Sequence, residues 1–448
     1  MIAIVVSRAD SASEHVGEHL LHLADWETSE DERRPDGEGG GTVYRSTGFE
    51  LREFDDLHLD LDDVAAAFDD PDMLVFASRH AGDTGALLTA HFTGNFGPAE
   101  YGGEDDALAE ACPNAQKALV GAFDRHAPGS YDVGMECTHH GPSSVGVPSM
   151  FVELGSGEEQ WTDPAGAEAV ARAILDIEGV DPHRERTVVG FGGNHYVPRF
   201  ERVVRETEWA VGHIAADWGI DAMGHPAEHR DVLRQAFENS GAEHALVDGD
   251  HPVLCEELES LGYRVVSETW LREVDGRDLG LVAELESAIC PVEEGLRFGD
   301  AGDEPTKDEL EVGDGAWSVR ELPKELLDAA QGIDRERVLG LASAHTVAYE
   351  TVQNGTRVEG RAAVSEAGFD ALVDGLVGLL EEKYDSVTRE EDAVVATTSA
   401  FDPARAAEIG VPEGPSFGRL ANGESVDVDG RTVTPEDVST ERVDRFVL

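Results

Sequence analysis

Hydrophobic runs alternate with amphipathic segments along the first two thirds of the chain. Runs that are apolar throughout and end in polar residues or glycine are typical of strands buried on both faces; they cover residues 1–8, 72–80, 86–94, 149–156 and 187–194, with shorter runs at 244–250 and 263–268. Residues 43–61 predict a strand or hairpin, and 131–141 a strand that ends in polar side chains.

Helical periodicity lies between these runs. It predicts helices over 11–23, with Ser11 as the N-cap, and over 114–125, 165–178, 208–219 and 253–262. Strands that alternate with helices indicate an α/β fold, a mixed and largely parallel sheet flanked by helices. The acidic, glycine-rich stretch 27–42 reads as a flexible surface insertion.

The chain changes character after about residue 280. Only His345, of 17 histidines, follows Pro252; a helix is predicted over 365–384 and hairpin-like turns over 410–438. We therefore expect a domain of residues 1–280 and a smaller α+β module of residues 281–448 with no assigned role.

Charge sets the chain apart from an ordinary enzyme. Its 93 acidic and 34 basic residues give a formal net charge of -59, spread over all segments, which indicates a surface adapted to high salt. Such a surface neither supports nor excludes an RNA substrate. Without an apolar run long enough for a membrane span or a recognisable leader, a cytoplasmic protein with no membrane partner is expected.

Candidate chemistry gathers where the predicted strands end, which is where ligands bind in open α/β sheets. Four segments, 78–97, 135–142, 190–200 and 211–219, supply six histidines and one glutamate: His80, His91, Glu136, His139, His140, His195 and His213. Imidazoles and carboxylates are the ligands of catalytic zinc, so a metal centre is the natural hypothesis.

Plainer readings stand beside this one. A single histidine at a strand end is more often a structural hydrogen-bonding group, and adjacent residues on a strand, such as His139 and His140, point to opposite faces. Cys137 could instead be a nucleophile with His139. Asp217 would share a helix face with His213, although a solvated acid is the simpler account.

Glycines beside polar residues could bring backbone N–H groups close to an oxyanion. Gly192 and Gly193 in GFGGNH and Asn95 in HFTGNFG are such positions, although a turn that needs glycine is the commoner explanation. Arg199 could contact RNA or belong to a solvated face.

Several motifs occur together in one order: SRH with LLTAHFTGNFG, ECTHHGP with VPSMFVELGS, GFGGNHYVPRF and VGHI. In these the chain, from residue 1 to about 280, resembles the archaeal and plant type of D-aminoacyl-tRNA deacylase. The resemblance implies hydrolysis of the ester between a D-amino acid and the 3′ CCA end of tRNA, a monomer with two zinc ions per subunit, and a fold similar to phosphorylases and peptidyl-tRNA hydrolase. The insertion after Trp26 and the module after about residue 280 exceed that family's ordinary length.

We expect three sets of site residues on this basis. The catalytic set is Glu136, Thr138, His139 and His140, and the substrate-binding set is Asn95, Gly192, Gly193 and Arg199. The metal-binding set is His80, His91, His139, His195 and His213. Zinc-activated water would be the nucleophile. The alternatives are a zinc-dependent amidase or peptidase, and a non-catalytic RNA-binding or metal-storage protein.

Overall fold

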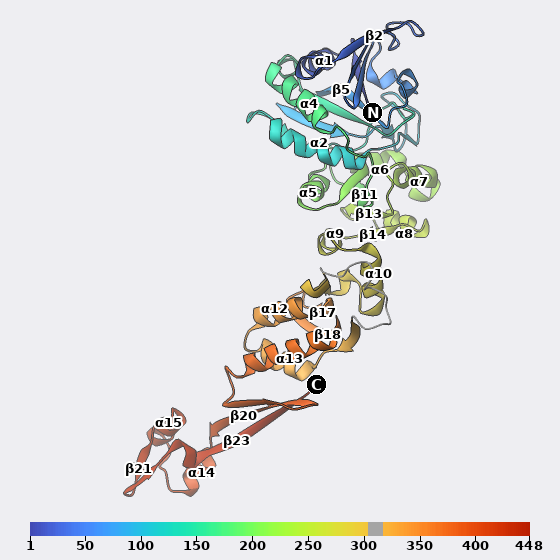
Figure 1. Ribbon diagram of the computed structural model, residues 1–448. Coiled ribbons are helices and arrows are strands. Elements are labelled where there is room, and N and C mark those ends of the chain that lie inside the picture. The colour runs from blue at the N-terminus through green and yellow to red at the C-terminus, as the bar shows by residue number, and fades with distance from the viewer. Residues whose placement is uncertain (303–316) are drawn as a thin grey trace. The chain divides into compact units, whose positions relative to one another are not determined.

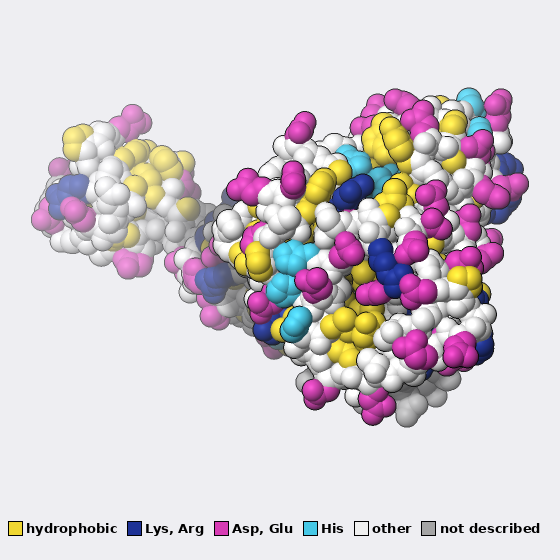
Figure 2. All heavy atoms as spheres, turned by 90° about the horizontal axis from the view of Figure 1, so that it is seen from above, with side chains coloured by type: hydrophobic (Ala, Val, Ile, Leu, Met, Phe, Trp, Pro, Cys, Tyr) yellow, Lys and Arg dark blue, Asp and Glu magenta, His cyan; other side chains and the backbone are white. Residues whose placement is uncertain are grey.

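The computed structural model describes residues 1–302 and 317–448, which fall into two units, residues 1–275 and 276–448 (Figure 1). The boundary expected near residue 280 lies close to this division. Each unit has its own sheets and its own hydrophobic core. Acidic side chains are scattered over the face seen in Figure 2.

The main sheet of the first unit is mixed. Its strands lie in the order β2 (Glu27–Asp31), β3 (Gly41–Ser46), β4 (Phe49–Phe54), β1 (Ile2–Ser7), β5 (Met73–Ala81), β10 (Ser149–Ser156), β6 (Leu87–His91) and β9 (Asp132–Val133). The central strands β4, β1, β5 and β10 pair in parallel, and β6 pairs antiparallel to β10. All residues of β1, β10 and β6 are buried, as their continuous apolar runs predict.

Both faces of this sheet are covered. Helices α1 (Ser11–Leu23), α2 (Pro113–His126) and α4 (Pro164–Asp176) cover one face (Figure 1). The short 3₁₀ helices η1 (His58–Asp60) and η2 (Val64–Ala67) lie on the chain segment that contributes to the core of the other face.

A second sheet in the same unit is wholly parallel, in the order β12 (Ala210–Ala215), β11 (Thr187–Gly192), β13 (His244–Asp248) and β14 (Arg264–Val266). Its strands are connected by α5 (Pro198–Glu206), α6 (Asp217–Met223), η3 (Pro226–Glu228), α7 (Arg230–Glu238) and α8 (Pro252–Ser260). Helix α3 (Glu158–Trp161) follows β10 of the main sheet, and α9 (Glu268–Glu273) follows β14. Strands β7 (Gly94–Asn95) and β8 (Ala107–Leu108) form a small ladder of their own.

The second unit is an α+β module of antiparallel sheets, as expected. One sheet has the order β15 (Leu296–Phe298), β17 (Ala348–Val352), β18 (Arg357–Val364) and β16 (Ser318–Glu321), with helices α10 (Leu279–Ala288), α11 (Lys324–Gln331), α12 (Arg335–His345) and α13 (Glu366–Leu380). The other comprises β19 (Ser386–Arg389), β20 (Ala393–Phe401) and β23 (Ser439–Val447). Helix α14 (Pro403–Glu408) follows β20. The predicted turns over 410–438 contain α15 (Pro415–Ala421), the hairpin of β21 (Val426–Val428) and β22 (Arg431–Val433), and η6 (Pro435–Val438).

Four local predictions were wrong. The helix expected over 208–219 is the buried strand β12 followed by α6, because Ala210–Ala215 pairs with β11 inside the second sheet. The supposed insertion 27–42 forms β2 and part of β3, whose pairing continues the main sheet at its edge. Only Asp132–Val133 of residues 131–141 is a strand. The N-cap of α1 is Asp10, whose side chain accepts from Ala12 N and Ser13 N.

Among the residues described, no helix combines the length and the apolar composition that a membrane span requires. The likeness to phosphorylases and peptidyl-tRNA hydrolase stays an expectation.

Candidate metal centre and active site

The segment from Met135 to Pro142 is an irregular loop, and three of its backbone hydrogen bonds tie it to distant segments. Cys137 N donates to His195 O (2.9 Å), Thr138 N to Ile214 O (2.9 Å) and Gly141 N to Tyr101 O (2.9 Å). The loop is therefore tied to the end of β12, to the segment after β11 and to the loop that carries Tyr101. Residues far apart in the sequence meet here.

The rings of His139 and His140 converge instead of pointing to opposite faces. His140 has φ +46°, in the left-handed region, and the two ring centroids lie 4.4 Å apart. We expected the two side chains to point to opposite faces because we assumed an extended strand. The backbone turns into the left-handed region at His140 instead, so that expectation was wrong.

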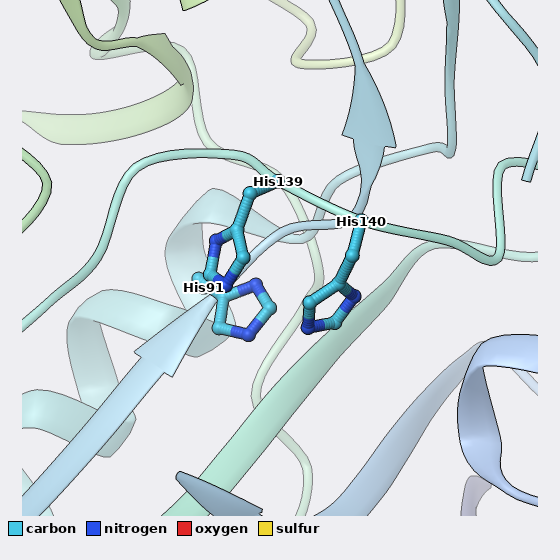
Figure 3. A group of neighbouring side chains, drawn as sticks. All are labelled: His91, His139 and His140. Carbon is cyan, nitrogen blue, oxygen red and sulfur yellow. The ribbon is translucent and has the colours of Figure 1, made fainter. Parts of the chain in front are cut away.

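His91, at the end of β6, joins this pair, and the three imidazoles face a common space (Figure 3). Each Nδ1 lies at a backbone carbonyl: that of His91 at Phe92 O (3.0 Å), that of His139 at Cys137 O (2.8 Å) and that of His140 at Gly141 O (2.8 Å). Because a carbonyl can only accept, each Nδ1 carries the proton and each Nε2 keeps its lone pair.

These lone pairs suit a metal ion. The His91 ring is fully buried, and its Nε2 lies 3.5 Å from Glu153 Oε1 without an aligned hydrogen bond among the described residues. Burial lowers the pKa of His91, but the Glu153 carboxylate outweighs it and raises that pKa above its ordinary value, so His91 would bind a metal ion only after Nε2 loses any proton. One ligand atom from each imidazole lies within 4.8 Å of the others. Burial and the neighbouring imidazoles lower the pKa of His139 well below its ordinary value and that of His140 to about 4, so both rings are neutral. The residues fit a metal site held by three histidines.

Glu136 is a buried carboxylate beside the imidazoles. Its Oε2 accepts from His195 Nε2 at 2.6 Å, and its Oε1 lies 3.2 Å from His80 Nδ1 without hydrogen-bond alignment. Burial alone would raise the pKa of Glu136, but the contacts with His195 and His80 outweigh it and hold that pKa well below its ordinary value. Glu136 is therefore ionised.

Glu153 on β10 completes this part of the site, and the sequence analysis missed it. Its carboxylate accepts from Ser78 Oγ (3.1 Å) and lies 3.3 Å from His80 Nδ1. Burial lowers the pKa of His80, but the two carboxylates, Glu136 and Glu153, raise it to about 10. The available signal was a single acid inside the apolar run 149–156, since a buried charge needs a partner.

Two further groups have the composition of a metal site. His80, Glu136 and Glu153 form one, and Cys137, His139 and His195 form the other, with Cys137 Sγ 3.5 Å from His195 Nδ1. Burial and the charge of Glu136 raise the pKa of Cys137 to about 12, which argues against the alternative of a free thiolate nucleophile.

A cavity of about 420 Å³ opens over these side chains. Its lining combines the ionisable side chains of His80, Glu136, His139, His140, Glu153 and His195 with the apolar residues Leu57, Leu59, Ala81 and Phe151. Arg79 also lines it, with its guanidinium carbon 5.3 Å from the Trp161 ring centroid. The arrangement can hold a cation, move a proton and admit a small polar group.

Two predicted residues have structural contacts instead. His213, placed in the metal-binding set, is fully buried, with Nδ1 at Thr138 Oγ1 (3.0 Å) and Nε2 at Ala109 O (2.8 Å), so neither ring nitrogen is available. Thr138 also accepts from Ile214 N (3.0 Å). Its side chain therefore fastens the loop to β12. His213 and Asp217 share no helix face, because His213 lies on a strand.

The predicted substrate-binding residues lie outside the lining of this cavity. Gly192 and Gly193 have positive φ, and a Cβ on Gly192 would lie 1.9 Å from Asp248 O, so the close turn requires glycine. Arg199 on α5 pairs with Asp248 (3.1 Å) and Glu268 (3.4 Å). Asn95 lines a neighbouring cavity that shares His139, His140 and His195 with the first. Their roles toward a substrate stay predictions.

Comparison with known proteins gives a consistent picture. A model of the D-aminoacyl-tRNA deacylase family matches residues 67–266. The chain is 57% identical to the D-aminoacyl-tRNA deacylase of Haloarcula marismortui, over all of both chains, and 32% identical to that of Methanococcoides burtonii, over all of this chain and 96% of that one. A crystal structure of a conserved protein of unknown function covers 61% of this chain and 96% of its own, with a TM-score of 0.54 and 31% identity. Since identity at this level extends along the whole chain, the protein belongs to the D-aminoacyl-tRNA deacylase family.

Proposed function

We propose that this protein hydrolyses the ester bond of D-aminoacyl-tRNA and releases a free D-amino acid and a reusable tRNA. The name of its full-length relatives supports this reaction. The observation that carries it in the site is the group of His91, His139 and His140, with Nε2 lone pairs beside the ionised Glu136. Ester hydrolysis needs such a combination of an electrophile site and a proton acceptor.

We further propose zinc as the metal, with two ions per subunit. His91, His139 and His140 would hold the first, since three imidazoles are a known ligand set of catalytic zinc, and any proton on His91 Nε2 would leave when the ion binds. His80 and Glu153 would hold the second after His80 loses its proton, which leaves Glu136 as the proton acceptor. Bound zinc would supply Lewis-acid chemistry to the ester carbonyl.

The chain's own groups account for the proton transfers. Glu136 Oε1 has no aligned donor among the described residues, so it is free to take a proton from an attacking water. His195 and His80 fix the orientation of the Glu136 carboxyl group from both sides. Glu136 would return the proton to the ribose oxygen that leaves with the tRNA.

Backbone donors of the same loop would stabilise the oxyanion. Within residues 1–302 and 317–448, no acceptor is recorded for the backbone N–H of His139 or of His140, whereas the N–H groups of Cys137, Thr138 and Gly141 all donate. The two N–H groups are therefore available to a developing negative charge beside the imidazoles.

The aminoacyl part of the substrate suits the polar cavity. The aminoacyl group is small and polar, and the cavity of about 420 Å³ beside the proposed metal ligands has room for it. We propose that residues 1–280 carry the catalytic activity, that residues 281–448 are an extension, and that the enzyme acts in the cytoplasm as a monomer.

The decisive experiment measures release of labelled amino acid from matched D- and L-aminoacyl-tRNA by the full chain in multimolar KCl, with and without a chelator. Hydrolysis of the D-form alone, lost on chelation and restored by zinc, is expected. His139→Ala and His195→Ala should abolish turnover, whereas His22→Ala, on the exposed face of α1, should not. Cleavage of a peptide in place of the tRNA ester would favour an amidase, and no turnover of any substrate would contradict catalysis.

A further inference from the structure

A second cavity of about 470 Å³ lies against the first, between the loop of residues 95–101 and helix α6. The two cavities share Tyr101, His139, His140 and His195. A Cβ on Gly97 would lie 2.8 Å from the Ala222 backbone, so the loop packs closely against α6. The shared imidazoles form a wall between two spaces of different chemistry.

The second cavity carries two exposed aromatic side chains. Tyr101 is 68% exposed and Trp218, on α6, is 49% exposed. Across the described parts of the chain, the other large hydrophobic side chains exposed to this degree are all valines. Figure 2 shows hydrophobic side chains next to histidines on one face of the molecule. Exposed aromatic groups at the edge of a site are typical of stacking surfaces for unpaired bases.

Both aromatic residues lie next to the metal-binding loop. The Trp218 side chain neighbours the Cys137 thiol. The backbone carbonyl of Tyr101 accepts a hydrogen bond from Gly141 N of that loop (2.9 Å), which anchors the backbone that carries the ring. An anchored backbone leaves only side-chain freedom to be lost when a ligand stacks on the ring.

Charge distinguishes what each cavity can bind. Among the described residues no lysine or arginine lines the second cavity, and the one carboxylate in that lining, Glu100, would repel a phosphate. A neutral planar group therefore fits it better than a nucleic-acid backbone. Asn95 donates through Nδ2 to Gly102 O and Glu104 O, and no donor to its Oδ1 is recorded in the described residues. That oxygen can accept from the amino group of a base.

We propose that this second cavity binds the unpaired nucleobase at the 3′ end of the tRNA, by stacking on Trp218 and Tyr101. The inference rests on the proposed function, because it places the two halves of one substrate on either side of the shared imidazoles. The cationic aminoacyl group enters the polar cavity, the base enters the aromatic one, and the ester that joins them lies at the wall where the metal ligands meet.

Stacking also suits a protein with a net charge of -59. Contacts to phosphate weaken as salt rises, whereas stacking releases few counterions. A substrate recognised through its terminal base can therefore bind in concentrated salt to a surface that carries few free cations.

The first test measures binding of the trinucleotide CCA to the full chain in multimolar KCl by equilibrium dialysis. Trp218→Ala and Tyr101→Ala should each weaken binding about tenfold, whereas Trp218→Phe should keep most of the affinity. Val253→Ala, which removes an exposed side chain outside the cavity, is the control and should match the wild type. Unchanged binding in both alanine variants, or equal losses in Trp218→Ala and Trp218→Phe, would overturn the proposal.

The second test compares kcat/KM for D-aminoacyl-tRNA with kcat/KM for the ethyl ester of the same D-amino acid, which lacks the base. Trp218→Ala should lower kcat/KM for D-aminoacyl-tRNA about tenfold relative to kcat/KM for the ethyl ester. Equal losses on both substrates would assign the cavity to the amino-acid side chain instead. If the wild type bound CCA but hydrolysed neither ester, the proposed function would fail while the base site stood.

Discussion

Arg52→Met tests how strongly a buried ion network holds the edge of the main sheet. Arg52 lies on β4 with no exposed side-chain surface, and its guanidinium donates to Glu50 (2.6 Å), Asp31 (2.9 Å) and Gly39 O (2.7 Å). The guanidinium carbon Cζ of Arg52 lies 5.6 Å from the Phe68 ring centroid. The network joins β4 to β2 and to the loop between β2 and β3.

The magnitude follows from these distances. At an effective dielectric constant of about 20, each of the two ion pairs, with Asp31 and with Glu50, contributes a gross attraction of about 6 kcal/mol, most of which desolvation offsets. Arg33 (2.9 Å) stays paired with Asp31, and Arg45 (2.8 Å) with Glu50, so neither carboxylate is left alone. We therefore expect a loss of about 3 kcal/mol, at the lower end for a broken buried pair. In a unit of this size that lowers the Tm by about 6 °C.

The assay is thermal unfolding of the full chain in multimolar KCl, followed by far-UV circular dichroism. Arg172→Met is the matched control, because Arg172 pairs with Glu168 on the surface of α4 with both side chains more than two fifths exposed. Salt screens that pair, with a Debye length of about 3 Å at molar concentration, so no measurable change is expected. A Tm for Arg52→Met within about 1 °C of the wild type would refute the reasoning.

Three further predictions concern the site and the response to acid. Removal of the metal with a chelator should lower the free energy of unfolding by about 2.7 kcal/mol if the free metal concentration was a hundred times its Kd. His91→Ala should lower the amount of metal bound per chain, measured by mass spectrometry. Full retention of metal in that variant would contradict the three-histidine site. Glu136→Gln should lower kcat for D-aminoacyl-tRNA by about 10²–10⁴ with an unchanged circular dichroism spectrum, and a kcat near that of the wild type would exclude Glu136 as the proton acceptor. Glu268 is paired with Arg202 and Arg272, and these contacts lower its pKa to about 2 although burial opposes them. This stabilisation is complete above the ordinary pKa of a glutamate and is lost as the pH falls toward 2. Glu268→Gln should therefore reduce the loss of unfolding free energy at acidic pH by about 1 kcal/mol after solvent screening, and an unchanged loss would contradict this prediction.

The buried elements were the predictable part of the fold. Strands β1, β5, β6 and β10 read directly from apolar runs because both of their faces are covered. The hairpin strand β2 could not be read in this way, since four of its five residues are exposed and carry no apolar alternation. Strand β12 was taken for a helix because a short apolar run fits both periods, and only its pairing with β11 decides between them.

The site was predictable in composition and less so in geometry. Six of the seven singled-out side chains meet around one space; His213 does not, because hydrogen bonds to Thr138 and Ala109 use both of its ring nitrogens. Partners of this kind depend on tertiary contacts between distant segments. Glu153 was missed for a related reason: the run around it reads as core, and the ring of His80 that faces it comes from another strand.

The left-handed backbone at His140 has a wider consequence. On a regular strand, two consecutive histidines would point to opposite faces and could not bind one metal ion together. Here the positive φ of His140 brings the two rings together. A designer who moves this motif to another protein must therefore reproduce the left-handed turn as well as the sequence. A β-branched residue in place of His140 would disfavour that turn and so displace the ring of His139 too.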